Sequence, residues 1–216
     1  MRLTRRMLCL ALCLMLIPLP ALGEESASAP TVRIYLKRLN LTDRADLWLE
    51  GVYTAATGGE AIMAFPRGAE ITLQVRGGSI YLFYEGMSVQ VGTRLTLIQN
   101  ESGQTGQEGV RFSEGGNLYP GALQWTVEDG VLMPILTLSV EDYLMGVVPY
   151  EMSNLFPLEA LKAQAVCART YALAHLNPSA AYDMVDTTAN QVFRGINPAN
   201  LNAIRAIEET AGVVGG

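Results

Sequence analysis

The sequence predicts an α+β fold, in which a β-rich N-terminal half precedes a half that mixes helices and strands. From Val32 to Ser139, short runs of branched and aromatic residues alternate with Gly, Asn or Pro, as in antiparallel sheets. After Ser139 the apolar spacing becomes helical, and an alanine-rich stretch follows Pro157. Half of the 216 residues are apolar, so the chain can bury a substantial core.

The first residues have the pattern of an export signal. Three arginines precede an apolar run at 7–17, and residues 21–23 have the small-x-small pattern of a cleavage site. We expect an exported, extracytoplasmic protein whose residues 1–23 are either cleaved or kept as a membrane anchor. This segment is the only expected contact with a membrane. The small, polar residues 24–30 predict a linker.

Charge and cysteine content argue against a nucleic-acid-binding protein and against an internal disulfide. Without the three arginines of residues 1–23, twelve basic residues face 21 acidic ones, a net charge near −9. Such a charge argues against nucleic acid as a partner, since phosphates require a basic surface. Cys167 would be the single remaining thiol, so no internal disulfide is expected. We interpret Cys167 as a small apolar residue on a buried helix face, because the sole histidine, His175, lies two turns away.

The region 31–113 is expected to form an antiparallel sheet or a small sandwich, and further strands follow it. The glycine-rich residues 101–109 predict an exposed hairpin tip, and no helix is expected before residue 139. The expected strands are 32–36, 46–55, 60–65, 70–77, 79–86, 94–100, 109–112, 122–130 and 131–139.

Capping residues and proline delimit the expected helices. Ser139 is a good N-cap for a first helix, with Asp142 as the capping acid, and Pro149 is expected to end that helix. A second helix is expected to start at Pro157 and to end at 177–178. Its predicted buried face consists of Leu158, Leu161, Ala165, Ala168 and Ala172.

A last helix is expected at 198–211, with Gly212 as its stop. Its predicted buried side consists of Leu201, Ile204 and Ile207.

Glu151 is the most conspicuous polar residue between the first two helices. It is predicted to lie on a loop held by apolar packing at both ends, beside the segment that starts at Gln191. Met152, Leu155 and Phe156 are expected to desolvate its carboxyl, so that it holds a proton near neutral pH. The alternative is a surface glutamate that caps the following helix.

Three stretches of the chain resemble the stage II sporulation protein D (SpoIID) family, whose domain also occurs in the amidase enhancer LytB. They are LSVEDYLMGVVPYEMSNLFPLEALKAQAVCARTYAL, VDTTANQVFRG and AIRAIEETAGVV. The resemblance covers roughly residues 115–214, and we expect a SpoIID-like domain at 114–216. The region 31–113 resembles the variable N-terminal part of the family by position alone.

The resemblance implies a lytic transglycosylase that acts on peptidoglycan in sporulation-type remodelling of the cell wall. Glu151 matches the glutamate of the family's E-M motif, which is held to be its catalytic acid and base. Glycoside hydrolysis usually needs two carboxylates. A lytic transglycosylase needs one, because the 6-hydroxyl of muramic acid attacks its own C1.

Other polar residues of the motifs are candidates for binding the glycan. Lys162, Gln164 and Arg169 lie on the second helix, where the alternative is a solvated face or pairing such as Glu159 with Lys162. Tyr171 has a ring that can stack on a sugar, and Thr188, with Asp186, is expected to orient the groove.

Gln191 and Arg194 match a part of the family thought to line the glycan groove. The alternative is that Gln191 and Arg194 finish a strand and turn before Gly195.

The sequence departs from the family in two respects. Some members bind zinc through Cys and His just before the Q-V-Y/F segment, where this chain has 187–190 without either residue, so we expect no metal and no cofactor. The family pattern also continues beyond T-x-G, whereas this sequence ends at Gly216. We therefore expect a C-terminally truncated domain, or a fold that closes differently.

Two other functions compete with the enzyme. The LytB branch suggests a non-catalytic module that binds glycan strands and enhances a cell-wall amidase, which would then be the partner. A purely structural envelope domain is the third reading, because the N-terminal half has no recognisable site.

Overall fold

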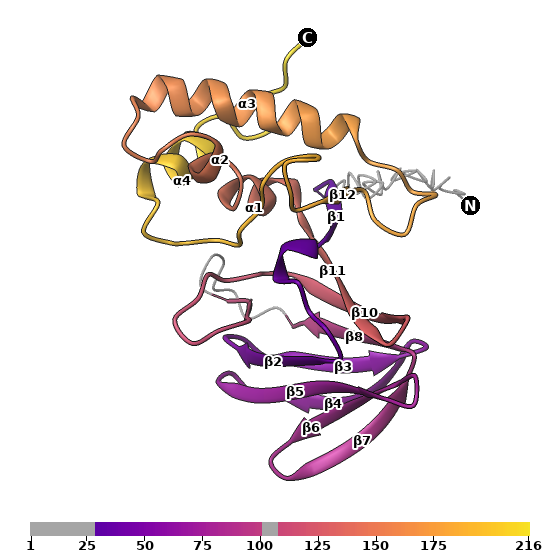
Figure 1. Ribbon diagram of the computed structural model, residues 1–216. Helices are drawn as coiled ribbons and strands as arrows, with labels where there is room; N and C mark the ends of the chain where they lie inside the picture. Colours follow the sequence, from indigo (N-terminus) through magenta and orange to yellow (C-terminus); the bar gives the residue numbers. More distant parts are fainter. Residues whose placement is uncertain (1–28, 101–107) are drawn as a thin grey trace, which may run out of the picture.

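The computed structural model describes residues 29–100 and 108–216 (Figure 1). The expected export signal, and most of the expected linker and hairpin tip, lie outside these residues. Within the described ranges, no helix has the length and apolar character needed to cross a membrane.

Two sheets make up the β-rich part, as the predicted α+β class requires. The larger has seven strands, and all its pairs are antiparallel except that between β1 and β12. Its order is β12 (Met184–Val185), β1 (Thr31–Tyr35), β11 (Val131–Ser139), β10 (Ala122–Glu128), β8 (Arg94–Gln99), β3 (Tyr53–Thr57) and β4 (Glu60–Phe65). This sheet therefore joins strands from both sides of residue 113.

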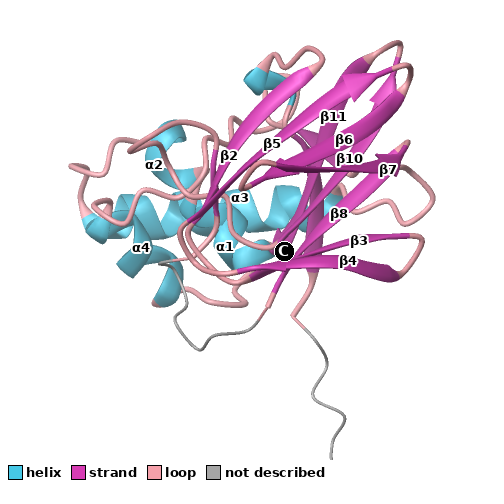
Figure 2. Ribbon diagram, turned by 90° about the horizontal axis from the view of Figure 1, so that it is seen from below, coloured by secondary structure: helices cyan, strands magenta, loops and turns pink. Residues whose placement is uncertain are grey.

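The smaller sheet has five strands, all antiparallel. Its order is β7 (Met87–Gly92), β6 (Ser79–Tyr84), β5 (Ala69–Arg76), β2 (Arg44–Leu49) and β9 (Val110–Arg111). Figure 2 shows β2, β5 and β6 running side by side.

Alternation of apolar and polar residues decides which face of each sheet is buried. In β2, Ala45, Leu47 and Leu49 are buried, whereas Arg44 and Asp46 are exposed. The buried residues of β2 belong to the same hydrophobic cluster as residues of β8 and β10 in the larger sheet. The two sheets thus share one core, and the outer face of the smaller sheet is left to solvent.

The described residues form four α-helices, which lie at one end of the molecule, with β5, β6 and β7 at the opposite end (Figure 1). The helices are α1 (Val140–Met145), α2 (Val148–Glu151), α3 (Leu158–Ala174) and α4 (Leu201–Glu208), and a 3₁₀ helix, η1, spans Lys37–Leu39. The Ser139 cap is confirmed, since its Oγ accepts a hydrogen bond from the Asp142 N–H at 3.0 Å.

The buried face of α3 is largely the one predicted. Its buried residues are Leu161, Ala165, Ala168, Arg169 and Ala172, and Leu158 is half-buried. Alanines let α1 and α4 pack closely against this face. Cys167 is exposed, so the expectation that it is buried is wrong: its side chain lies on the opposite side of α3.

Several boundaries differ from the predicted ones. The run 46–55 is divided between β2 and β3, while β7 and β12 were not predicted. Pro149 does not end the first helix but lies in the first turn of α2, where its missing N–H has no intrahelical partner to lose.

The last helix is shorter than expected. α4 begins at Leu201, whose side chain is 69% exposed, so the expectation that Leu201 is buried is wrong. Ile207 is buried as predicted, and Ile204 is half-buried.

Candidate functional site

Glu151 is the last residue of α2 rather than part of a loop. Its backbone N–H donates to the Val147 carbonyl at 3.0 Å, which closes the single helical turn. Its exposed carboxylate accepts a hydrogen bond from the Val192 N–H, with 3.2 Å between N and Oε1. The carboxylate therefore lies beside the segment that starts at Gln191, as predicted from the sequence.

The apolar cover expected over Glu151 is absent. Leu155 and Phe156 are 88% and 50% exposed, and Met152 packs on the hydrophobic core instead. The intervening Asn154 accounts for this path of the chain, because its Oδ1 accepts from the Ala203 N–H at 2.9 Å and so caps α4. Water can reach the Glu151 carboxyl freely, and a bound ligand would have to exclude it.

A second contact fixes the turn between α1 and α2 against the same segment. The Arg194 N–H donates to the Gly146 carbonyl at 3.1 Å, and Phe193 packs beside Gly146. A Cβ on Gly146 would lie 2.3 Å from Cε2 of Phe193, so only glycine permits this approach. The position of Glu151 thus depends on close packing between residues that are far apart in the sequence.

Gln191 is a packing residue in this structure. It is 8% exposed; its Oε1 accepts from the Tyr143 hydroxyl at 3.3 Å and its Nε2 donates to the Ala168 carbonyl at 3.5 Å. The sugar-binding role expected for Gln191 is therefore replaced by a link between α1 and α3. Burial raises the pKa of the Tyr143 hydroxyl far above its ordinary value, and the charge of Glu151 contributes to the same shift.

Arg194 is exposed and borders a pocket. Its guanidinium carbon lies 5.3 Å from the centroid of the Tyr150 ring, a cation–π distance. Asn117 donates through Nδ2 to the Tyr150 hydroxyl at 2.5 Å and to the Arg194 carbonyl at 2.9 Å. Asn117 and Arg194 are thus both joined to Tyr150, the residue that precedes Glu151.

Arg194 and Asn117 line a cavity with a volume of about 420 Å³, which we call the Arg194 pocket. Arg38, Phe112 and Tyr119 also line it. Of these lining residues, only Arg194 was expected from the sequence. Nothing in the sequence indicates that residues 38 and 112 lie in the same place.

Asp186 binds the backbone of Arg38, one of the residues that line the pocket. It is 2% exposed and accepts a hydrogen bond from the backbone N–H of Arg38 at 2.9 Å. Burial raises the pKa of Asp186 to about 6, although hydrogen bonding by that N–H and the positive charge of Arg38 act in the opposite direction. Asp186 therefore orients the chain at Arg38, whereas Thr188, with which it was expected to act, is exposed on the following turn.

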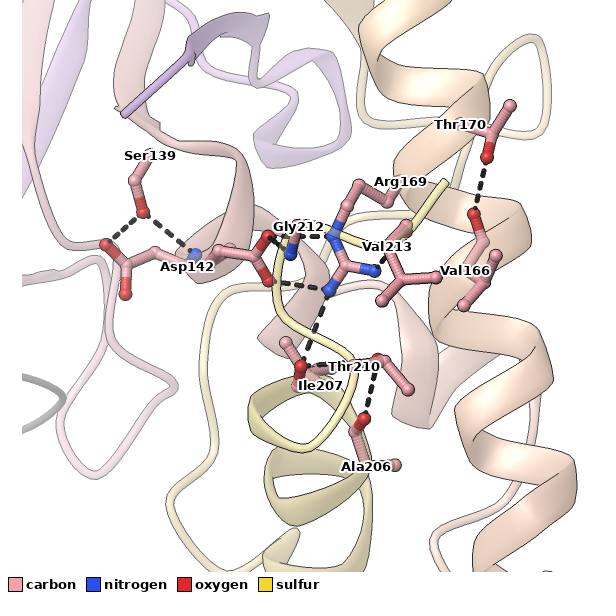
Figure 3. A network of polar contacts seen from close by, with 11 residues as sticks. Ser139, Asp142, Val166, Arg169, Thr170, Ala206, Ile207, Thr210, Gly212 and Val213 are labelled. Atoms are coloured by element: carbon pink, nitrogen blue, oxygen red, sulfur yellow. Dashed lines mark hydrogen bonds and ion pairs between the residues drawn. The ribbon is translucent and has the colours of Figure 1, made fainter. Parts of the chain in front are cut away.

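Arg169 is a structural residue, contrary to its expected role in sugar binding. Its side chain is 1% exposed and forms a two-pronged ion pair with Glu141, at 2.7 Å for both Nε and Nη2 (Figure 3). Nη1 donates to the Val213 carbonyl at 2.9 Å, and Nη2 lies 3.4 Å from the Ile207 carbonyl. The guanidinium joins α1, α3 and the chain that follows α4, and no face of it remains for a glycan.

Lys162 is also engaged within the protein. Its Nζ lies 2.8 Å from Glu159 and 2.7 Å from Glu209, which confirms the predicted Glu159 pair and adds a second one. The hydrogen bond to Glu159 and that to Glu209 raise the pKa of Lys162, and Lys162 in turn lowers the pKa of Glu209.

Tyr171, Gln164 and Thr188 are the remaining candidates. Tyr171 is half-buried, stacks on His175 with ring centroids 3.9 Å apart, and accepts a hydrogen bond from Asn190 at 3.2 Å. Gln164 is half-buried on α3. In the part of the chain that the structure describes, no hydrogen bond joins Tyr171, Gln164 or Thr188 to Glu151. Over the same residues, no cluster of three or more His, Cys, Asp or Glu is arranged to hold a metal ion.

Part of the chain matches a known protein family. Residues 128–215 match the SpoIID family, described as stage II sporulation protein. An uncharacterized protein of Brachyspira hyodysenteriae is 38% identical over 129 residues, which is 56% of this chain and 35% of that protein. The amidase enhancer of Bacillus subtilis is 45% identical over 71 residues, 33% of this chain and 9% of that protein.

The chain thus spans a minor part of the length of both relatives. No solved structure matches it. The family match includes α1, α2, α3 and α4 and both sides of the Glu151 contact. Residues 128–215 therefore match a SpoIID-family domain.

Proposed function

We propose that this protein is a lytic transglycosylase that cleaves peptidoglycan glycan strands between N-acetylmuramic acid and N-acetylglucosamine, with Glu151 as general acid and base. The observation that carries the proposal is the position of the Glu151 carboxylate. It is exposed and held by the Val192 N–H, and the preceding residue, Tyr150, contacts Arg194, which lines the Arg194 pocket.

A single carboxyl group is sufficient for this reaction. Protonated Glu151 donates its proton to the glycosidic oxygen as the bond to C1 of muramic acid breaks. The carboxylate then accepts the proton of the muramic 6-hydroxyl as that oxygen bonds to C1, which forms a 1,6-anhydro end and leaves Glu151 protonated for the next cycle. Asp186 is not a second catalytic acid in this scheme, because it is buried and bonded to the Arg38 backbone.

The surroundings of Glu151 suit a large ligand. Because Leu155 and Phe156 leave the carboxyl open, the sugar rings themselves would displace water from it on binding. The guanidinium of Arg194 gives the Arg194 pocket a positive charge. Peptide-free strands are nearly neutral apart from the lactyl carboxylates of muramic acid, and Arg194 can bind such a group.

The test is a Glu151→Gln variant incubated with peptide-stripped glycan strands. We expect mass spectrometry to detect 1,6-anhydromuramic ends with the unmodified protein and none with Glu151→Gln. Glu159→Gln is the matched control, since Glu159 is also an exposed glutamate of the same segment, and this variant should retain the product. Undiminished product from Glu151→Gln would remove Glu151 from the mechanism.

A second function is favoured by one specific observation, the identity of 45% over 71 residues with an amidase enhancer. In that role the protein would bind glycan at the same site and stimulate a cell-wall amidase without cleaving the strand. Tight binding of peptide-stripped strands without anhydro product, together with amidase stimulation that Glu151→Gln retains, would favour the enhancer over the enzyme.

A further inference from the structure

The outer face of the five-stranded sheet carries a cavity of about 450 Å³, which we call the Trp48 pocket. Figure 1 shows β5 and β6 on the far side of β2 from the helices. The pocket is lined by Arg44, Asp46 and Trp48 of β2, Glu70 and Thr72 of β5, and Phe83 of β6. It shares no lining residue with the Arg194 pocket, and the proposed function does not use it.

The floor of the Trp48 pocket is a fixed polar strip. Asp46 accepts hydrogen bonds from Nε and Nη2 of Arg44 at 3.1 and 2.7 Å, and from the Thr72 hydroxyl at 2.6 Å. The hydrogen bond from Arg44 lowers the pKa of Asp46, so the carboxylate is ionised at neutral pH and is a strong acceptor. Because these side chains already hold one another, a ligand would not have to order them.

Aromatic rings flank this strip on the same face. The register places Asp46 opposite Thr72 and Thr72 opposite Phe83, so the three side chains form one row across the sheet. Trp48 is half-buried and lies opposite Glu70 in the next row. Arg76 is stacked over Phe83, with its guanidinium carbon 4.9 Å from the ring centroid.

This combination of groups fits a sugar. A pyranose ring has an apolar C–H face that packs on an aromatic ring, and hydroxyls that both donate to carboxylates and accept from guanidinium groups. The charges disfavour densely charged anionic ligands, because Asp46, Glu70 and Glu85 line the pocket and Arg44 is the one basic lining residue. Phosphates, nucleic acids and acidic lipids would be repelled.

The short strand β9 connects the Trp48 pocket with the Arg194 pocket. Arg111 is the register partner of Trp48, so the two side chains are neighbours on the same face. The Arg111 side chain donates to the Gly116 carbonyl, and Gly116 lines the Arg194 pocket next to Phe112. A glycan that extends from the Arg194 pocket along β9 would therefore contact Trp48.

We propose that the Trp48 pocket is a glycan-binding subsite, which holds a part of the strand remote from Glu151 while the Arg194 pocket holds the part nearer to it. The identity of the ligand as a glycan rests on the proposed function, whereas binding at Trp48 does not require that Glu151 is catalytic. Simultaneous contact at both pockets would favour long strands over short ones.

Tryptophan fluorescence can test this directly. The chain has two tryptophans, and Trp125 is fully buried, so a ligand at the surface should change the emission of Trp48. We expect chitohexaose, titrated into the full chain, to change the emission with saturation and chitobiose to bind more weakly. Glu151→Gln should show the same titration, which separates this inference from the proposed function. A flat titration with chitohexaose would overturn the proposal.

Substitutions in the Trp48 pocket test whether the sugar binds there. Trp48→Ala and Asp46→Ala should each weaken chitohexaose binding, measured by calorimetry, about tenfold, because each removes a principal contact. Tyr182→Ala is the matched control: Tyr182 is a half-buried aromatic residue of a different cavity, and this variant should bind as the unmodified protein does. Circular dichroism verifies that each variant is folded. Unchanged affinity in folded Trp48→Ala and Asp46→Ala would show that the sugar binds elsewhere.

Discussion

Two charged residues of the same family segment, Arg169 and Glu151, end in opposite surroundings. Arg169 is 1% exposed, with an ion pair to Glu141 and bonds to two carbonyls. Glu151 is exposed, has no ion pair among the described residues, and accepts a hydrogen bond from a backbone N–H. The guanidinium holds helices together, whereas the carboxylate is presented to solvent.

The contrast between Arg169 and Glu151 shows that a polar residue within a motif can either stabilise the fold or lie on the exposed surface, where a ligand can bind. Burial and the number of internal partners distinguish the two roles. Arg169, Gln191 and Asp186 all belong to the scaffold by this criterion, since each is buried and bonded within the protein. Glu151 and Arg194 belong to the exposed surface.

The largest effect on folding is expected for Arg169→Ala. Its loss would leave Glu141 and the carbonyls of Val213 and Ile207 without their shared donor. We expect the free energy of unfolding to fall by about 3 kcal/mol, as for other buried ion pairs that lose one partner. Urea denaturation measures this loss. Lys162→Ala is the control, because its ion pairs with Glu159 and Glu209 lie at the surface, where such pairs contribute little to stability. Equal losses of stability in both variants would contradict the distinction between a buried and a surface ion pair.

A smaller effect on stability is expected for Gly146→Ala, a substitution in the turn between α1 and α2. The added Cβ would meet Phe193 at 2.3 Å, and α2 would have to move away from Val192. We expect a loss of about 2 kcal/mol from overpacking, together with a loss of glycan cleavage. Gly215→Ala is the control, since its Cβ would lie 3.6 Å from the Thr170 hydroxyl, an ordinary contact. A fully active Gly146→Ala protein would show that this turn does not position Glu151.

Asp186→Asn should raise stability at neutral pH. The pKa of Asp186 is raised from 3.8 to about 6, so the folded state favours its protonated form. The stabilisation from that form is complete below pH 3.8 and is lost as the pH rises through about 6. Asparagine remains neutral and keeps an acceptor for the Arg38 N–H, so the variant should gain about 2 kcal/mol at pH 7. Thermal unfolding between pH 4 and 7 tests this: the gain should vanish at the acid end.

The smallest effect on folding is expected for Glu151→Gln. Because Glu151 is exposed and glutamine can still accept from the Val192 N–H, the free energy of unfolding should change by less than about 0.5 kcal/mol. Chemical denaturation can be measured on the same sample that is assayed for anhydro ends. A large loss of stability would place Glu151 with Arg169 in the scaffold.

Much of the fold could be predicted from local pattern. Period-two alternation identified most strands of both sheets, and alanine spacing identified the buried face of α3. The same spacing also contained the signal that Arg169 is buried, because it lies four residues after Ala165 and three before Ala172. Its charge led instead to the expectation of a sugar-binding role, and its partner Glu141 is 28 residues away.

The candidate site was predictable only in part. The motif identified Glu151 and Arg194, but the exposure of Leu155 and Phe156 depends on Asn154 capping α4, a contact across 49 residues. The wall of the Arg194 pocket combines η1, the chain after β9 and the segment after Gln191. Such meetings are decided by tertiary packing, for which a single sequence carries no local signal.

The place of β1 in the larger sheet has a practical consequence. β1 lies between β11 and β12, yet residues 31–35 fall outside the stretch 128–215 that the family match delimits. A gene fragment cut at that limit would encode two strands whose middle neighbour is missing, and each would expose a row of unpaired backbone groups. Anyone who expresses this catalytic candidate for assay should begin upstream of Thr31, because a shorter polypeptide is prone to self-association through those open edges.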